Sequence, residues 1–389
     1  MASKVCFTDF HCAGDEGQLD KLKKLIIAAG TDDLDFDNKF VAVKVHFGEW
    51  GNMAFLRQQY AKIICDYVKT KGGKPFVTDC NTLYPGSRGN ALDHLDAAYM
   101  NGYNPLATGV HTIIADGLRG NDEQEIPVEG GEYVKTAKIG AAIAEADVII
   151  SLNHFKGHVA AGFGGALKNI GMGCGSKRGK MEMHSHGTPW VDEDICIGCG
   201  MCVRNCANQG VEVIDGIAVV DEDKCVGCGH CLGFCPVGSI QCKYDEAPAV
   251  LNYKIAEYSK AVLEGKQEFH VSLVVDVSPK CDCDPNNDIP IIPDVGMFAS
   301  KDAVAIDQAC VDACNRMPVM PGSVIGEHSH HHHHSCGCTV DCPGSADEEQ
   351  KETKRDVFRM VHPDTNWEAG LIHAEKLGIG TRDYELVTM

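Results

Sequence analysis

The pattern Cys-x2-Cys-x2-Cys-x3-Cys occurs twice in the middle of the chain, with the spacing that proteins use to bind [4Fe-4S] clusters. Each run places three thiolates on a short, glycine-supported loop, and its fourth cysteine reaches the neighbouring cluster. Two clusters are therefore predicted. The expected ligand sets are Cys196, Cys199, Cys202 and Cys235 for one cluster, and Cys225, Cys228, Cys231 and Cys206 for the other.

The segments around the two runs repeat as well. Acidic triplets, 192–194 and 221–223, precede both runs at the same offset. Between the runs, Asp215-Gly216 separates the apolar segments 211–214 and 217–220, which predicts a hairpin with a two-residue turn. A zinc ribbon is the alternative, but it uses two Cys-x2-Cys pairs per metal and does not require eight cysteines in this order.

A second group of polar residues follows the apolar segment 148–152. His154 and His158 come where that segment would leave a sheet, and a glycine-rich stretch leads on to Lys168. Ligands bind at the carboxyl ends of parallel strands, and a glycine-rich turn that opens a helix offers backbone N–H groups to an anion. We therefore expect a site here, which Lys44 and His46 could flank. Tight packing of the glycines, with the histidines on the surface, is the alternative.

Other residues with metal-binding or acid–base chemistry stand further along the chain. Cys281 and Cys283 suit soft-metal ligation or thiol redox chemistry, with buried inert cysteines as the alternative. Asp307 lies in an apolar helical segment, where a carboxylate should be paired or functional unless it faces solvent. Five histidines in a polar, low-complexity segment are expected to capture Ni, Zn or another transition metal weakly. They are His330, His331, His332, His333 and His334.

The elements around these residues alternate between short apolar runs and amphipathic helical patterns. Strands are expected at 41–47, 76–78, 112–115, 148–152 and 269–277. Helices are expected at 53–71, 90–100, 138–146, 252–264, 302–315 and 367–377. Such alternation predicts an α/β fold with a layered, mostly parallel sheet.

The cysteine-rich segment interrupts this alternation. We predict an α/β host domain in two parts, residues 1–188 and 244–389, with a small α+β two-[4Fe-4S] ferredoxin-like domain inserted at 189–243. The second part contains the His- and Cys-rich segment 327–355, which we expect to be a mobile loop.

Composition excludes several classes of protein. The 389 residues carry a formal net charge of -20, which argues against nucleic acid and favours a basic redox partner protein, although acidity also serves solubility. No apolar run approaches the ~20 residues of a membrane span, and no signal sequence precedes the first strand. We therefore expect a cytoplasmic protein whose 21 cysteines bind metal rather than form disulfides.

Several motifs together resemble those of the family named domain of unknown function 362, an uncharacterised iron–sulfur family. They are the segments 43–49, 78–84, 279–283, 293–296 and 305–307, and the glycine-rich stretch that ends at Lys168. The resemblance extends over nearly the whole chain except the His-rich segment. It implies an α/β host with a ferredoxin insert.

A shorter stretch is similar to the signature of nickel-pincer lactate racemases, His-x3-Gly-Phe-Ser-Gly-Gly-x-Lys. His158 and Lys168 match it, whereas Gly164 and Ala166 replace the serine and one glycine. The resemblance implies an acid–base role for His158, a cofactor tether for Lys168, and a nickel ligand at His184. The second acid–base histidine of that family would fall near residues 80–81, which are Cys and Asn.

Together these features favour a cytoplasmic, anaerobic iron–sulfur oxidoreductase whose clusters pass electrons to a site in the host crevice, where an unknown small molecule reacts. The catalytic candidates are His154, His158, Lys168, His184 and Asp307. A non-enzymatic electron carrier or metal-handling protein is one alternative. A nickel-pincer-type isomerase or racemase is another.

Overall fold

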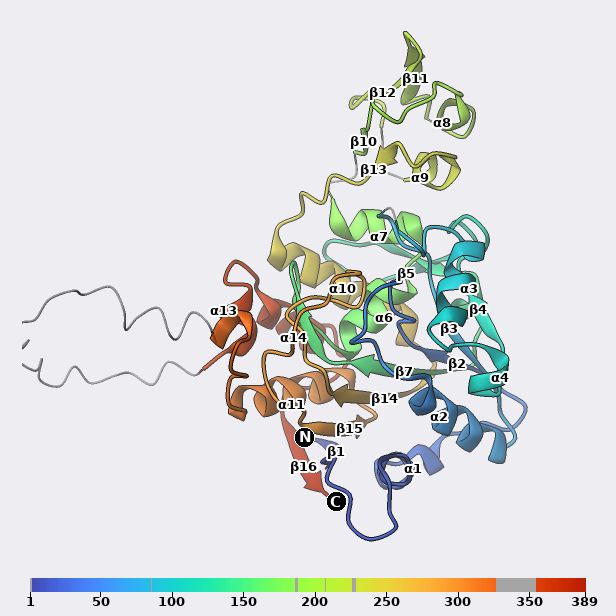
Figure 1. Ribbon diagram of the computed structural model, residues 1–389. Helices are drawn as coiled ribbons and strands as arrows, with labels where there is room; N and C mark the ends of the chain where they lie inside the picture. Colours follow the sequence, from blue (N-terminus) through green and yellow to red (C-terminus); the bar gives the residue numbers. More distant parts are fainter. Residues whose placement is uncertain (1, 85, 186–187, 207, 226–228, 327–354) are drawn as a thin grey trace, which may run out of the picture.

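The computed structural model describes residues 2–84, 86–185, 188–206, 208–225, 229–326 and 355–389. An eight-stranded sheet in the order β16-β1-β15-β14-β7-β2-β3-β4 forms its centre (Figure 1). Five neighbouring pairs are parallel, and β15 runs antiparallel to both of its neighbours. The strands are β1 (Ser3–Thr8), β2 (Phe40–Lys44), β3 (Lys74–Asp79), β4 (Thr112–Ile114), β7 (Val148–His154), β14 (Gln267–Val274), β15 (Gly296–Ser300) and β16 (Tyr384–Thr388). The predicted mostly parallel α/β sheet is confirmed.

Helices cover both faces of this sheet. One face packs on α1 (Gln18–Ala28), α2 (Gln58–Thr70), α3 (Ala91–Met100) and α4 (Pro105–Thr108). The other packs on α5 (Ala141–Ala144), α6 (Ala166–Cys174), α10 (Pro248–Leu263), α11 (Ala303–Arg316) and α14 (Trp367–Lys376). Along β7, Ile149 joins the core of one face and Ile150 that of the other. The strand is buried over its whole length because helices cover it on both sides.

The predicted helix at 138–146 is wrong in its first half. Residues Thr136–Gly140 form strand β6, and only Ala141–Ala144 are helical. The strand β5 (Glu123–Pro127) pairs with β6, so that Glu125 lies opposite Lys138. Because β5 is charged and largely exposed, it has no apolar pattern from which the strand could be predicted.

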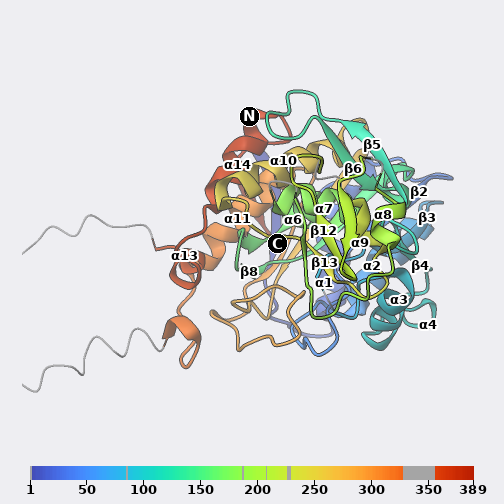
Figure 2. The same ribbon diagram turned by 90° about the horizontal axis from the view of Figure 1, so that it is seen from above.

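The cysteine-rich segment forms a projection above α7 (Lys177–His184) in Figure 1 and overlies the rest of the chain when seen from above (Figure 2). It contains β10 (Trp190–Val191), α8 (Met201–Arg204), β11 (Val211–Ile214), β12 (Ile217–Val220), α9 (His230–Phe234) and β13 (Ile240–Gln241). The predicted hairpin is confirmed, because β11 and β12 pair across Asp215 and Gly216, with positive φ of 51° and 85°. Gly200 and Gly229 begin α8 and α9 with nearly equal positive φ, so the sequence repeat is also a structural one.

Four short elements complete the described chain: the 3-10 helix η1 (Thr31–Asp33), β8 (Lys156–His158), β9 (Gly162–Gly164) and α13 (Val357–Val361). No helix among the described residues is both long and apolar enough to cross a bilayer. The five histidines predicted to capture metal, His330–His334, lie outside the described residues.

Candidate functional site

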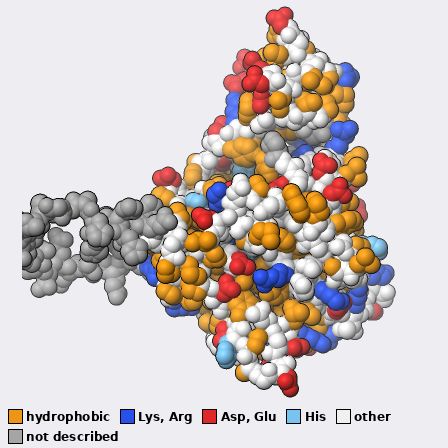
Figure 3. All heavy atoms as spheres, in the orientation of Figure 1, with side chains coloured by type: hydrophobic (Ala, Val, Ile, Leu, Met, Phe, Trp, Pro, Cys, Tyr) orange, Lys and Arg blue, Asp and Glu red, His pale blue; other side chains and the backbone are white. Residues whose placement is uncertain are grey.

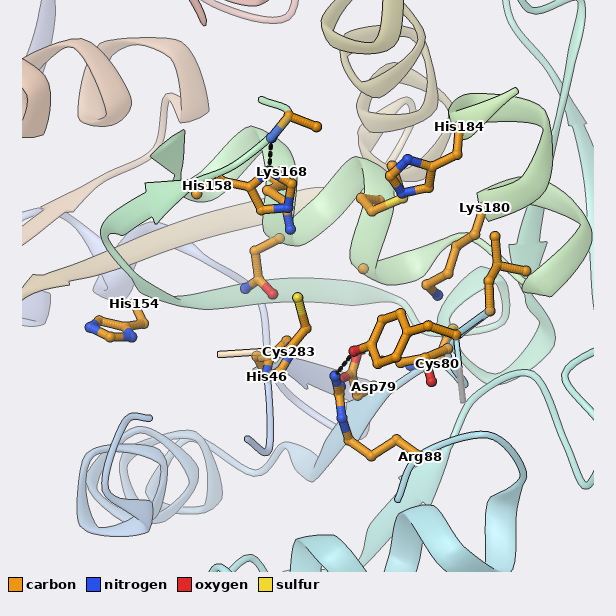
Figure 4. Close-up of a pocket in the computed structure, with 18 of the residues that line it drawn as sticks. His46, Asp79, Cys80, Arg88, His154, His158, Lys168, Lys180, His184 and Cys283 are labelled. Atoms are coloured by element: carbon orange, nitrogen blue, oxygen red, sulfur yellow. Dashed lines mark hydrogen bonds and ion pairs between the residues drawn. The ribbon is translucent and has the colours of Figure 1, made fainter. Parts of the chain in front are cut away.

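A cavity of about 380 Å³ lies where β2, β3 and β7 end (Figure 4). Lys44, Asp79 and His154 come from the last positions of these strands. The helices α6 and α7 close the opposite side. The predicted candidates His154, His158, Lys168, His184 and Cys283 all line it, as does the flanking His46. The sheet and the glycine-rich stretch therefore bring these residues together, and their catalytic roles stay predictions.

His158 is held in one tautomer by the loop that follows it. Its Nδ1 accepts the backbone N–H of Ala160 at 3.2 Å and of Ala161 at 3.0 Å (Figure 4). Burial, followed by the positive charge of Lys168, keeps the pKa of His158 well below its usual value. The ring is therefore neutral and carries its proton on Nε2. His158 thus faces the cavity as a hydrogen-bond donor.

Lys168 points at a pair of cysteine thiols. Its Nζ lies 3.7 Å from Cys281 Sγ. A hydrogen bond from Cys283, and then Lys168 and Lys156, lower the pKa of Cys281 well below its usual value, while that of Cys283 is raised because the pair shares one proton. Donor atoms of His158, Cys281 and Cys283 lie within 4.8 Å of one another, so the group is compatible with one soft metal ion.

A buried ion-pair network forms the wall opposite His158. Asp79 Oδ1 lies 3.0 Å from Lys44 Nζ, and its Oδ2 lies 3.3 Å from Arg88. Arg88 also pairs with Glu49 at 3.0 Å. Although burial raises the pKa of Asp79, Lys44 and its other cationic neighbours keep it below its ordinary value. Asn169 on α6 accepts a hydrogen bond from Lys44 at 2.7 Å, which ties the network to the glycine-rich helix.

His154 lines the cavity, but both of its ring nitrogens are already engaged. Its Nδ1 lies 2.8 Å from Asp282 and its Nε2 lies 2.7 Å from the carbonyl oxygen of Val275, so both ring nitrogens have partners. Lys156 pairs with the same carboxylate at 3.1 Å. Burial raises the pKa of Asp282, but His154 and Lys156 outweigh it and hold it below its usual range. This geometry assigns His154 a positioning role, because it joins the end of β7 to the segment that follows β14.

The predicted anion site at the start of the glycine-rich helix is wrong. Asp307 of α11 already occupies it, accepting the backbone N–H of Ala166 at 2.6 Å and of Leu167 at 3.0 Å. Burial raises the pKa of Asp307 to about 7. Asp307 is absent from the lining of the 380 Å³ cavity, and capping of α6 accounts for its burial.

The projection holds four of the predicted cluster ligands around one small pocket. Three belong to the first cysteine run and one to the second: Cys196, Cys199, Cys202 and Cys235. Ala218 N–H donates to Cys196 Sγ at 3.4 Å, and Ser239 N–H donates to Cys235 Sγ at 3.2 Å. The bond from Ala218 lowers the pKa of Cys196. Burial raises the pKa of Cys235, but the hydrogen bonds from the Ser239 hydroxyl and from backbone N–H groups outweigh it, so that this pKa is also lowered. At Cys196 and Cys235 the surroundings therefore favour the thiolate, the form that binds metal, whereas burial raises the pKa of Cys202.

The second predicted set is only partly described. Cys206, Cys225 and Cys231 are placed, with Gly210 N–H donating to Cys206 Sγ at 3.2 Å, whereas Cys228 lies outside the described residues. The described thiols are compatible with metal binding.

The projection and the cavity share a wall. Met181 of α7 is fully buried among Cys202, Cys231 and Leu232 of the projection, while Lys180 beside it lines the cavity. A second crevice of about 560 Å³ lies between the projection and the host, and Cys235 and Tyr84 both line it. Tyr84 lines the 380 Å³ cavity as well. One tyrosine therefore stands between a candidate cluster ligand and the cavity.

Comparison with known families places the chain. The family called Domain of unknown function (DUF362) matches residues 41–312, more than half of the sequence. The chain belongs to the DUF362 family. This confirms the resemblance recognised in its motifs. No curated protein matches the sequence.

Two solved structures are similar to part of this DUF362 chain. The lactate racemase apoprotein from Thermoanaerobacterium thermosaccharolyticum is 13% identical with a TM-score of 0.38, and 70% of this chain covers 51% of it. A protein from Thermotoga maritima is 14% identical with a TM-score of 0.33, at 68% and 52% coverage. This chain spans about half of each, and scores this low bear on neither chemistry nor substrate.

Sequence reasoning missed several residues of this DUF362 site. Lys180 and Lys156 had no pattern that marked them, and Arg88 reaches Asp79 only through tertiary structure. Asp79 could have been found, because it ends a parallel strand beside β2.

Proposed function

We propose that this DUF362 chain is an iron–sulfur oxidoreductase. Its inserted ferredoxin-like segment would bind two [4Fe-4S] clusters, and the cavity in the α/β host would bind the small molecule that exchanges electrons with them. Bound clusters would supply single-electron transfer. The observation that carries this proposal is that cysteines from two separate runs meet in one pocket, and that one of them, Cys235, also lines the crevice between the projection and the host.

The donor set around that pocket suits a cluster. Cys235 stands 33 residues or more beyond the other three thiols, and the crossed ligation of paired clusters requires such a distant fourth ligand. The N–H···S bonds from Ala218 and Ser239 stabilise negative charge on sulfur. A zinc ribbon would instead pair the thiols two by two within each run.

The host is arranged to receive the electrons. Leu83 and Tyr84 line both the crevice beside Cys235 and the cavity, so this segment adjoins both sites. Met181 and Lys180, adjacent on α7, face the projection and the cavity respectively. A rigid helix and one aromatic side chain thus connect the candidate cluster pocket to the cavity.

A basic redox partner is the proposed electron donor. Acidic side chains gather on the projection in the face shown in Figure 3. The exposed acidic residues of the projection include Glu193, Asp194, Glu222 and Asp223. Complementary charge would raise the rate of encounter and make it fall with ionic strength.

The test begins with anaerobic purification. Iron should reach about eight atoms per chain, as two [4Fe-4S] clusters require, and the reduced protein should give the EPR signals of such clusters. The clusters are then photoreduced, and small electron acceptors are screened for reoxidation by visible absorbance. Ala160→Trp at the cavity wall should slow the reoxidation, whereas Leu106→Trp, at a side chain that is 99% exposed, should not.

If acceptors reoxidise both variants equally and only a partner protein accelerates the reaction, the chain is an electron carrier and the enzymatic proposal fails. Iron well below the expected content, with zinc in its place, would exclude the clusters themselves.

A nickel-pincer-type isomerase remains a second candidate because of one observation. His158, Lys168 and His184, which match that signature by type and spacing, line the same cavity. Intact-mass analysis of natively purified protein decides the matter. An adduct on Lys168 would support this candidate, and an unmodified Lys168 would remove it.

A further inference from the structure

Two lysines of the cavity, Lys168 and Lys180, have no carboxylate partner in the described part of the chain. Lys44 and Arg88 share Asp79 and Glu49, and Lys156 pairs with Asp282. Among the described residues, neither Lys168 nor Lys180 has a carboxylate within 4.0 Å. The thiols beside Lys168 can offset its charge. Lys180 is only 8% exposed, and within the described ranges its amine donates a hydrogen bond only to the backbone oxygen of Gly175.

The histidines of the cavity do not balance the positive charge of these lysines, which instead helps to lower the histidine pKa values. Burial and then Lys168 and Lys180 lower the pKa of His184 to about 3. His158 keeps a proton on Nε2 because its Nδ1 accepts two backbone N–H groups. A histidine that binds a metal through one ring nitrogen instead donates a hydrogen bond from the N–H of the other. His158 is therefore better suited to hydrogen-bond an anion than to join the two thiols around a metal ion.

Apolar side chains form much of the remaining wall, beside Thr82, Tyr84 and Glu246, whose carboxylate pairs with Lys254. Leu56, Leu83, Leu152, Met172 and Leu251 line the same 380 Å³ space, whose size is that of a small-molecule site. A bare inorganic anion would leave these surfaces facing water. Phosphate would also lack its usual cradle, because Asp307 already takes the N–H groups that open α6.

We propose that the cavity binds an organic monocarboxylate with an apolar body. Its carboxylate would be held by Lys180, and its body would lie against the leucine and methionine side chains, with Lys168 and the Nε2–H of His158 on another side of the same cavity. This inference names the substrate class of the proposed reaction site, and in that sense rests on the proposed function. It requires no electron transfer of its own.

The experiment uses the full, oxidised, cluster-containing protein and measures binding by isothermal titration. Benzoate is the probe. Benzyl alcohol has the same aromatic ring with a neutral hydroxyl in place of the carboxylate, and acetate has the carboxylate without the ring. Inorganic phosphate is a competing anion. We expect benzoate to bind saturably, at least about tenfold more tightly than each of the others. Lys180→Met should weaken benzoate binding by about tenfold or more, Lys180→Arg should retain most of it, and the surface substitution Lys23→Met should change nothing.

Equal binding of benzyl alcohol, preferential binding of phosphate, or unaltered binding by Lys180→Met would each overturn the inference, as would the absence of benzoate binding. Unchanged cluster EPR spectra verify that the variants fold. Because binding is read on the oxidised protein, its failure is distinct from a failure of cluster reoxidation in the function test.

Discussion

The carboxylate of Asp307 accepts the backbone N–H of Ala166 at 2.6 Å, across 141 residues of sequence. The other oxygen takes Leu167 N–H at 3.0 Å. A side chain of α11 therefore caps the helix that carries Lys168, and the orientation of that lysine depends on it.

Removing this cap should destabilise the fold. Asp307→Ala leaves two buried N–H groups without acceptors, and we expect it to lower the free energy of unfolding by about 2 to 5 kcal/mol. Asp307→Asn keeps one acceptor and should cost about half as much. Urea unfolding measures both. Equal stability of Asp307→Ala and wild type would show that the cap is dispensable.

The glycine next to this cap has no room for a side chain. A Cβ on Gly165 would lie 2.2 Å from Asp307 Oδ1, whereas one on Gly164 would meet nothing closer than Lys156 Nζ at 3.4 Å. Gly165→Ala should therefore lower stability by about 1 to 3 kcal/mol, as overpacking does, and Gly164→Ala should remain within about 0.5 kcal/mol of wild type. Thermal unfolding of the two variants side by side gives the comparison, and similar losses in both would contradict the close contact.

Cys235 provides a test of crossed ligation. We expect Cys235→Ser to remove the cluster held mainly by the first run, so that iron falls from about eight to about four atoms per chain. Cys242 is equally part of the projection and is buried, but it belongs to neither run. Cys242→Ala should thus keep the full iron content. Loss of iron in both variants would indicate general unfolding of the projection instead.

His94 should make the protein sensitive to acid. It is fully buried on α3, its ring nitrogens lack hydrogen-bond partners within the described residues, and burial lowers its pKa to about 3. The unfolded chain, with a histidine pKa near 6.5, takes up this proton first as pH falls, so acid favours unfolding between about pH 6.5 and pH 3. From pH 7 to pH 5 this group should cost about 2 kcal/mol.

The variant His94→Leu isolates that contribution. Its free energy of unfolding should fall less than that of wild type between pH 7 and pH 5, by about 2 kcal/mol. Urea titrations at both pH values supply the four numbers required. Parallel losses in the two proteins would mean that His94 is protonated in the folded state.

Local chemistry is what the sequence determined by itself. The Cys-x2-Cys spacing, the Asp215-Gly216 turn and the apolar run at 148–152 each act over a few residues, so they could be read without a structure, and the hairpin and the central strand β7 are where they were predicted. The parallel α/β sheet followed from the alternation of such segments, although its edge strand β16 was not foreseen.

Only the tertiary structure decided which groups meet. Asp307 turned out to occupy the helix start where an anion was predicted, because α11 packs against α6 from far along the chain. Strand β6 displaced half of a predicted helix because β5 lies beside it. Lys180 became part of the cavity because α7 carries it there, while its neighbour Met181 packs under the projection. Burial, charge balance and partner choice depend on contacts between distant segments, and no local pattern encodes them.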